Sequence, residues 1–141
     1  MEKDKIKVAA YLRLSKEEFS NEKESNSITN QKLIIDNYLD KNKEYILVDY
    51  YIDDGYSGTN FNRPEFQRML EDIKNKKIDV IVIKDLSRLG RNYIETGNFI
   101  EVIFPGMGVS VISVDENCEF DSSDYYGDDY LPLKNLFNDM Y

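Results

Sequence analysis

The sequence predicts an α/β fold in which a mostly parallel central sheet is flanked by helices. Short apolar runs alternate with amphipathic stretches, in the order strand, helix, strand, helix, strand, helix, strand. Strands joined by helical crossovers pair in parallel, because each crossover returns the chain to the same end of the sheet. With 141 residues, 41% of them hydrophobic, the chain is long enough for one core and short for two. We therefore expect a single domain over residues 1–141.

Four strands are predicted, at residues 6–12, 45–52, 78–83 and 109–114. Each run is mainly apolar and rich in β-branched or aromatic side chains. Near-continuous apolar runs of this length are typical of strands that are covered on both faces. The strands therefore fit the interior of a sheet with helices on its two sides.

Helices are predicted between the strands from apolar spacing and from start signals. Ser27 is a candidate N-cap for a helix through residue 39. Pro64 suits the first turn of a second helix, whose apolar side chains recur at i, i+3, i+4 and i+7 from residue 66. A third helix is expected over residues 92–104, and the proline and glycine that follow should end it.

Two other segments are predicted as loops. Residues 16–26 are polar without periodicity, and residues 115–129 hold seven acidic residues and no base. An amphipathic helix then begins near Leu133 and has no stop signal before Tyr141. We therefore expect the chain to be part of a longer protein.

The residue types that are missing exclude several kinds of chemistry. The chain has no histidine, so it cannot form a Ser-His-Asp or Cys-His catalytic group. Its single cysteine, Cys118, cannot form an intrachain disulfide or a Cys-pair zinc site. We expect no metal and no cofactor. No apolar run approaches 18 residues and no leader peptide is visible, so we expect a cytoplasmic protein without a membrane span.

Taken alone, the net charge of −9 argues against a DNA-binding module, because phosphate neutralisation needs clustered positive charge. The charge is uneven along the chain, however. Residues 63–91 hold eight bases and five acids. The middle of the chain is therefore mildly basic within an acidic protein.

Arginines concentrate in the three loops that follow the first three strands. Lysine outnumbers arginine 13 to 5, yet four of the five arginines lie in these loops, which make up under a quarter of the chain. They are Arg13, Arg63, Arg88 and Arg91. Loops after parallel strands share one edge of the sheet, and a guanidinium can grip phosphate or carboxylate with two hydrogen bonds. The arginines therefore indicate an anion site; the alternative is pairing with nearby acids such as Asp53, Asp54 and Asp85.

Ser15 also has two interpretations. Ser15 and Glu18 match the S-x-x-E capping box, which makes the serine a helix cap. Its position beside the arginine loops instead favours a nucleophile. Ser27 and Gln31 are more simply an N-cap and a polar residue on a helix face.

Three blocks of the chain resemble a known family. Tyr11-Leu12-Arg13-Leu14-Ser15 is similar to the Y-x-R-x-S signature of serine recombinases, the resolvase/invertase superfamily. Residues 53–64 and 84–91 resemble its second and third conserved blocks. Residues 131–138 resemble the large serine recombinase branch, which includes transposon recombinases and phage integrases. The similarity runs in order along nearly the whole chain.

The resemblance implies roles for particular residues. Ser15 would be the nucleophile, surrounded by Arg13, Arg63, Arg88, Arg91 and Gln31. One position departs from small resolvases, which commonly carry Asp immediately before the first arginine of the third block. Here that residue is Ser87, as in the large branch, so no acid–base role of that Asp can be transferred.

The implied activity is DNA strand cleavage and rejoining through a 5′-phosphoserine intermediate, without ATP or metal. The implied partners are double-stranded DNA and further copies of the protein, which would form dimers and then tetramers. Residues 1–141 would be the catalytic domain, cut before a long helix and a DNA-binding region. Two alternatives stay open: a catalytically silent assembly module, and an acidic flavodoxin-like signalling domain.

Overall fold

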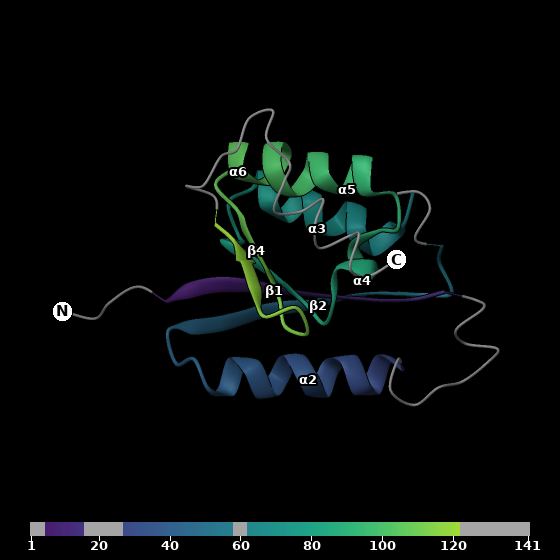
Figure 1. The fold of residues 1–141 in the computed structure, drawn as a ribbon. Coiled ribbons are helices and arrows are strands. Elements are labelled where there is room, and N and C mark those ends of the chain that lie inside the picture. The colour runs from purple at the N-terminus through teal and green to yellow at the C-terminus, as the bar shows by residue number, and fades with distance from the viewer. Residues whose placement is uncertain (1–4, 16–26, 58–61, 122–141) are drawn as a thin grey trace.

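Five strands form one sheet, in the order β2-β1-β3-β4-β5 (Figure 1). The computed structural model describes residues 5–15, 27–57 and 62–121. The strands are β1 (Ile6–Leu14), β2 (Tyr45–Asp54), β3 (Val80–Ile83), β4 (Ser110–Ser113) and β5 (Cys118–Phe120). The first four pair in parallel and β5 is antiparallel to β4. The predicted mostly parallel α/β fold is confirmed.

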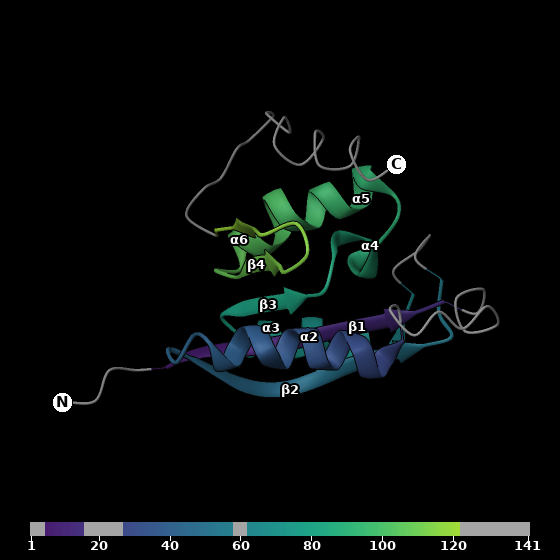
Figure 2. The same cartoon turned by 60° about the horizontal axis from the view of Figure 1, so that its bottom comes forward.

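Helices cover both faces of this sheet (Figures 1 and 2). Helix α2 (Ile28–Asp40) lies on one face, and α3 (Pro64–Lys74) lies on the other with the helical stretch from residue 93 to 106. That stretch consists of α5 (Tyr93–Asn98), a π-helical turn η2 (Phe99–Ile103) and α6 (Phe104–Gly106). The short helix α4 (Leu86–Leu89) follows β3 directly. No helix in the described part of the chain is long and apolar enough to cross a membrane.

The central strand β1 divides the core into two layers. Val8, Ala10 and Leu12 pack in one cluster with Ile35 of α2. The alternate residues Ala9 and Tyr11 belong to the cluster on the other face, with Phe66, Met69 and Phe104. All three β1 residues of the first cluster are fully buried, as are Ala9 and Tyr11. Burial on both sides explains why this run is apolar throughout instead of alternating.

The helix start signals act as the sequence predicts. The Ser27 hydroxyl accepts a hydrogen bond from the Asn30 amide at 3.0 Å, which caps α2. Pro64 occupies the first turn of α3. The third helical stretch runs over residues 93–106 and contains a π-helical turn. It ends at Gly106, one of the two predicted stop residues, and Pro105 lies in the first turn of α6, where a missing N–H is tolerated.

One predicted loop is partly wrong. Residues 118–120 of the acidic segment form β5, which pairs with β4. Phe120 is 4% exposed and joins the core, and Asn117 adopts the positive φ of 50° that a tight turn requires. The acidic composition of the segment predicts a loop, although Phe120 within it packs into the core. The predictions for residues 16–26, for residue 122 onward and for the helix at Leu133 lie outside the described residues.

Candidate active site

The first loop of the candidate site begins where β1 ends. Arg13 and Leu14 are still in the strand, and Ser15, 2% exposed, follows it directly. The Leu14 carbonyl accepts hydrogen bonds from the amides of Gly55 and Tyr56, at 2.6 and 3.2 Å. Ser15 therefore lies beside the loop that follows β2. The capping-box partner Glu18 lies outside the described residues.

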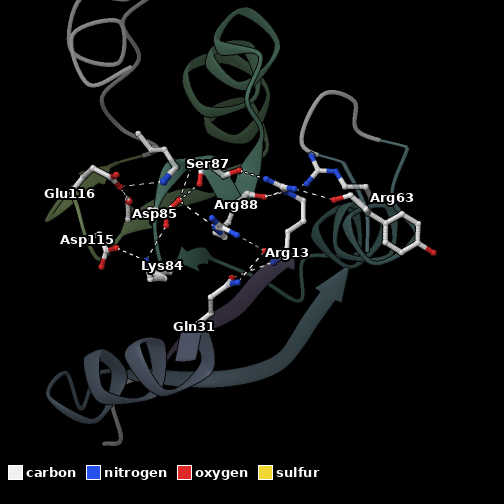
Figure 3. A network of polar contacts seen from close by, with 12 residues as sticks. Arg13, Gln31, Arg63, Lys84, Asp85, Ser87, Arg88, Asp115 and Glu116 are labelled. Carbon is white, nitrogen blue, oxygen red and sulfur yellow. Dashed lines mark hydrogen bonds and ion pairs between the residues drawn. The ribbon is translucent and has the colours of Figure 1, made fainter. Parts of the chain in front are cut away.

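Arg13 connects the end of β1 to the loops that follow β2 and β3 (Figure 3). Its buried guanidinium donates to the carbonyls of Tyr56 at 3.0 Å, Ser87 at 2.6 Å and Arg88 at 3.0 Å. The Gln31 side chain bonds both main-chain groups of Arg13, accepting from its amide at 3.3 Å and donating to its carbonyl at 3.0 Å. Gln31 thus holds the position of Arg13 from helix α2.

Arg63, which immediately precedes α3, also contacts the loop that follows β3. It is 1% exposed, and its guanidinium lies 5.1 Å from the ring centre of Phe66. It donates to the Tyr11 hydroxyl at 2.8 Å, to the Arg88 carbonyl at 3.3 Å and to the Leu89 carbonyl at 2.6 Å. Burial lowers the pKa of Arg63, and Tyr11 opposes that shift. Two buried guanidiniums, those of Arg13 and Arg63, therefore share the carbonyl oxygen of Arg88.

Arg88 lies on α4, whose start is capped by Asp85. The Asp85 carboxylate accepts from the Ser87 amide at 3.0 Å and from the Ser87 hydroxyl. The Arg88 guanidinium donates to the Arg13 carbonyl at 2.8 Å, and its Nε lies 3.4 Å from Asp85. Burial opposes ionisation of Asp85, but Arg88, Ser87 and Lys84 together lower its pKa. Asp85 is therefore an ionised cap and a poor proton acceptor.

The turn between β4 and β5 contacts residues 84–86 on the side opposite Arg63 (Figure 3). Lys84 binds Asp115 at 2.8 Å and Asp85 at 3.3 Å. Glu116 accepts from the Leu86 amide at 3.2 Å and from the Ser113 hydroxyl. Sequence reasoning missed these contacts, because Asp115 and Glu116 open a segment that looks like a solvated acidic loop.

The structure brings most of the predicted site residues together. Arg13, Gln31, Arg63 and Arg88 form one connected set of hydrogen bonds, and Ser15 lies two residues beyond Arg13. Arg91 belongs to the same loop and is exposed. Among the described contacts, Arg88 pairs with Asp85, and Arg13 and Arg63 donate to backbone carbonyls. The convergence follows from the parallel topology, which places these loops at one edge of the sheet.

One protein-family model matches nearly the whole chain. Residues 8–141 match the model of the resolvase N-terminal domain. The chain belongs to the resolvase family. This membership sets aside the flavodoxin-like alternative. No curated protein matches the sequence significantly.

Solved structures of serine recombinases share the fold of this resolvase-family chain. The N-terminal catalytic domain of TP901-1 integrase is 28% identical, with 95% of each chain covered and a TM-score of 0.73. A resolvase family site-specific recombinase from Streptococcus pneumoniae is 31% identical, with 96% of this chain and 85% of that chain covered and a TM-score of 0.70. The C-terminal catalytic domain of ISC1926 TnpA, an IS607-like serine recombinase, is 29% identical over 77% of this chain and 70% of that chain, with a TM-score of 0.63.

The resolvase-family site is cationic at its centre. Three guanidiniums, from Arg13, Arg63 and Arg88, meet within one hydrogen-bonded set. Within residues 5–15, 27–57 and 62–121, no group of three or more His, Cys, Asp or Glu side chains could hold a metal ion. Such a centre can bind an anion and stabilise negative charge that develops on it.

Proposed function

We propose that this site-specific recombinase domain cleaves DNA through Ser15. The Ser15 oxygen attacks a backbone phosphorus, the bond to the 3′ oxygen breaks, and a 5′-phosphoserine ester forms. The serine loses its proton and the departing 3′ oxygen gains one. A 3′ hydroxyl from a recombined strand then attacks the ester and restores both DNA and serine. The observation that carries the proposal is the position of Ser15 at the end of β1, beside three converging arginines.

The arginines divide between holding the loop and meeting the phosphate. Arg13 and Arg63 are buried and donate to carbonyls of residues 87–89. Arg88 and the exposed Arg91 lie on the loop so held, and we assign them the first contacts with the non-bridging oxygens. Arg13 would join them by exchanging a carbonyl for a phosphate oxygen. Because the loop holds Arg88 and Arg91 in place, these two guanidiniums stabilise the transition state with little reorganisation.

The experiment that tests this function maps the covalent link. The complete protein is incubated with recombination-site DNA nicked close to the crossover point, so that cleavage cannot be reversed, and the products are separated under denaturing conditions. We expect a protein–DNA adduct at the 5′ end, mapped by peptide sequencing to Ser15, and equal yield in EDTA. An adduct on another residue, or cleavage that only added magnesium restores, would contradict the proposal. Absence of any adduct on authentic site DNA would favour the silent assembly module.

We also expect residues 1–141 alone to bind duplex DNA weakly and with little sequence preference. The reason is the net charge of −9, which opposes phosphate binding outside the arginine site. Titration of labelled duplexes at about 0.15 M salt, near physiological ionic strength, measures this. Submicromolar, site-selective binding would contradict it. In the complete protein, sequence reading and assembly into dimers and tetramers would fall to other regions.

A further inference from the structure

A buried chain of hydrogen bonds connects β1 to Arg63. The Tyr11 hydroxyl donates to Asp53 at 2.8 Å and accepts from Arg63 at 2.8 Å. Tyr11 is fully buried, and Asp53 and Arg63 are each 1% exposed. Burial raises the pKa of Tyr11 far above its usual range, so the phenol keeps its proton for Asp53. The Tyr11 hydroxyl is thus engaged by Asp53 and Arg63.

Asp53 fixes the start of helix α3. Its carboxylate accepts from the amides of Glu65 and Phe66, each at 2.9 Å. The residue that would normally cap the helix is Arg63, whose side chain makes no capping hydrogen bond. The Asp53 carboxylate therefore replaces the missing cap. Its negative charge also interacts favourably with the helix dipole at the N-terminus of α3. Because Arg63 immediately precedes α3, Asp53 also fixes where the backbone of Arg63 lies.

Arg63 transmits that position to the third loop of the site, residues 84–91, which follow β3 and include α4. It donates to the carbonyls of Arg88 and Leu89, the last two residues of α4. These carbonyls belong to the same short backbone segment as Arg88 and Arg91. A shift of Arg63 would therefore move the backbone that carries Arg88 and Arg91.

We propose that Tyr11 and Asp53 are positioning residues that set the geometry of the third loop through Arg63. This inference rests on the proposed function, since its effect on cleavage requires that Arg88 and Arg91 meet the phosphate. Its effect on the loop itself does not depend on cleavage. The proposed function and the positioning inference can therefore be refuted independently.

Tyr51 provides a matched control. It is fully buried, lies on the neighbouring strand β2 and packs in the same cluster as Tyr11. Its hydroxyl also donates to a carboxylate, that of Asp72 on α3. Its described hydrogen bond reaches α3 and not the third loop, and Asp72 lies more than two turns beyond the start of that helix. Tyr51→Phe therefore removes a similar hydrogen bond without touching Arg63.

The test compares Tyr11→Phe with Tyr51→Phe in three measurements. Melting temperatures should fall by similar amounts, because each loses one buried tyrosine–carboxylate bond. In the complete protein, adduct formation well below melting should fall about tenfold to a hundredfold in Tyr11→Phe, the range for one hydrogen bond to a charged group, and less than threefold in Tyr51→Phe. Amide hydrogen exchange at residues 86–90 of the 141-residue chain should quicken only in Tyr11→Phe.

Equal exchange at residues 86–90 in the two variants would overturn the inference, whether or not any adduct forms. Equal adduct rates, with a normal adduct in the parent, would overturn it too. A parent that forms no adduct would refute the proposed function and leave the exchange comparison to decide this one. Should Tyr11→Phe not fold, Asp53→Asn replaces it. That variant keeps one acceptor oxygen for α3 but loses the charge that attracts Arg63, so the same faster exchange is expected.

Discussion

Ser15→Ala should abolish the covalent protein–DNA adduct while leaving the melting temperature almost unchanged. Alanine has no oxygen to attack phosphorus, so the intermediate cannot form at any rate. Ser15 is 2% exposed and follows the last residue of β1, and its replacement by alanine removes a single oxygen atom. Adduct yield on nicked DNA and a thermal melt of the same preparation measure the two effects.

Ser27→Ala is the matched control for the helix-cap interpretation of Ser15. Ser27 caps α2 through the Asn30 amide, and loss of such a cap costs about 0.5–2 kcal/mol of folding free energy. We expect Ser27→Ala to lower the melting temperature and keep the adduct, which is the opposite pattern. Persistence of the adduct in Ser15→Ala, together with a melting shift like that of Ser27→Ala, would mean that Ser15 is a cap.

Arg88→Lys and Arg91→Lys should each slow adduct formation by about 10²–10³, the usual cost of removing one donor to a developing oxyanion. Lysine keeps the charge but loses the planar fork that holds two oxygens. Arg91 is exposed, so the Arg91→Lys variant should have the same melting temperature as the parent. Arg88 also bonds the Arg13 carbonyl at 2.8 Å, so its variant should be somewhat less stable.

Arg68→Lys controls for the loss of an arginine elsewhere. Arg68 forms partly exposed ion pairs with Asp49 of β2 and Glu65 of α3, at 3.0 and 2.8 Å, and neither partner belongs to the third loop. Its substitution should leave the adduct rate within about twofold, because exposed ion pairs contribute little. Parental rates in both Arg88→Lys and Arg91→Lys would show that these arginines are structural.

The parallel sheet could be predicted from sequence because β1 and β3 are apolar runs that require cover on both faces. The convergence of Arg13, Arg63 and Arg88 followed from that topology alone. The partners of the arginines could not be predicted in the same way. Arg13 and Arg63 bind backbone carbonyls, and a carbonyl is present at every residue, so composition carries no signal for it.

The roles of Asp53 and Glu116 were missed for a different reason. Each acts on backbone amides far along the chain, Asp53 on α3 and Glu116 on α4. Capping rules look for a cap one residue before the helix, and Arg63 at that place offers none. The π-helical turn from Phe99 to Ile103 likewise has no sequence rule that would indicate it.

The contacts of Arg13 also constrain when the site can exist during synthesis and folding. Its hydrogen bonds to Ser87 and Arg88 join residues 74 and 75 apart in the chain. Closing so long a loop costs entropy that only the intervening strands and helices can offset, so these bonds form late. A nascent chain that already displays Ser15 therefore lacks its arginine surroundings until β3 and α4 have left the ribosome and packed. Incomplete chains of this recombinase should for that reason be unable to break DNA.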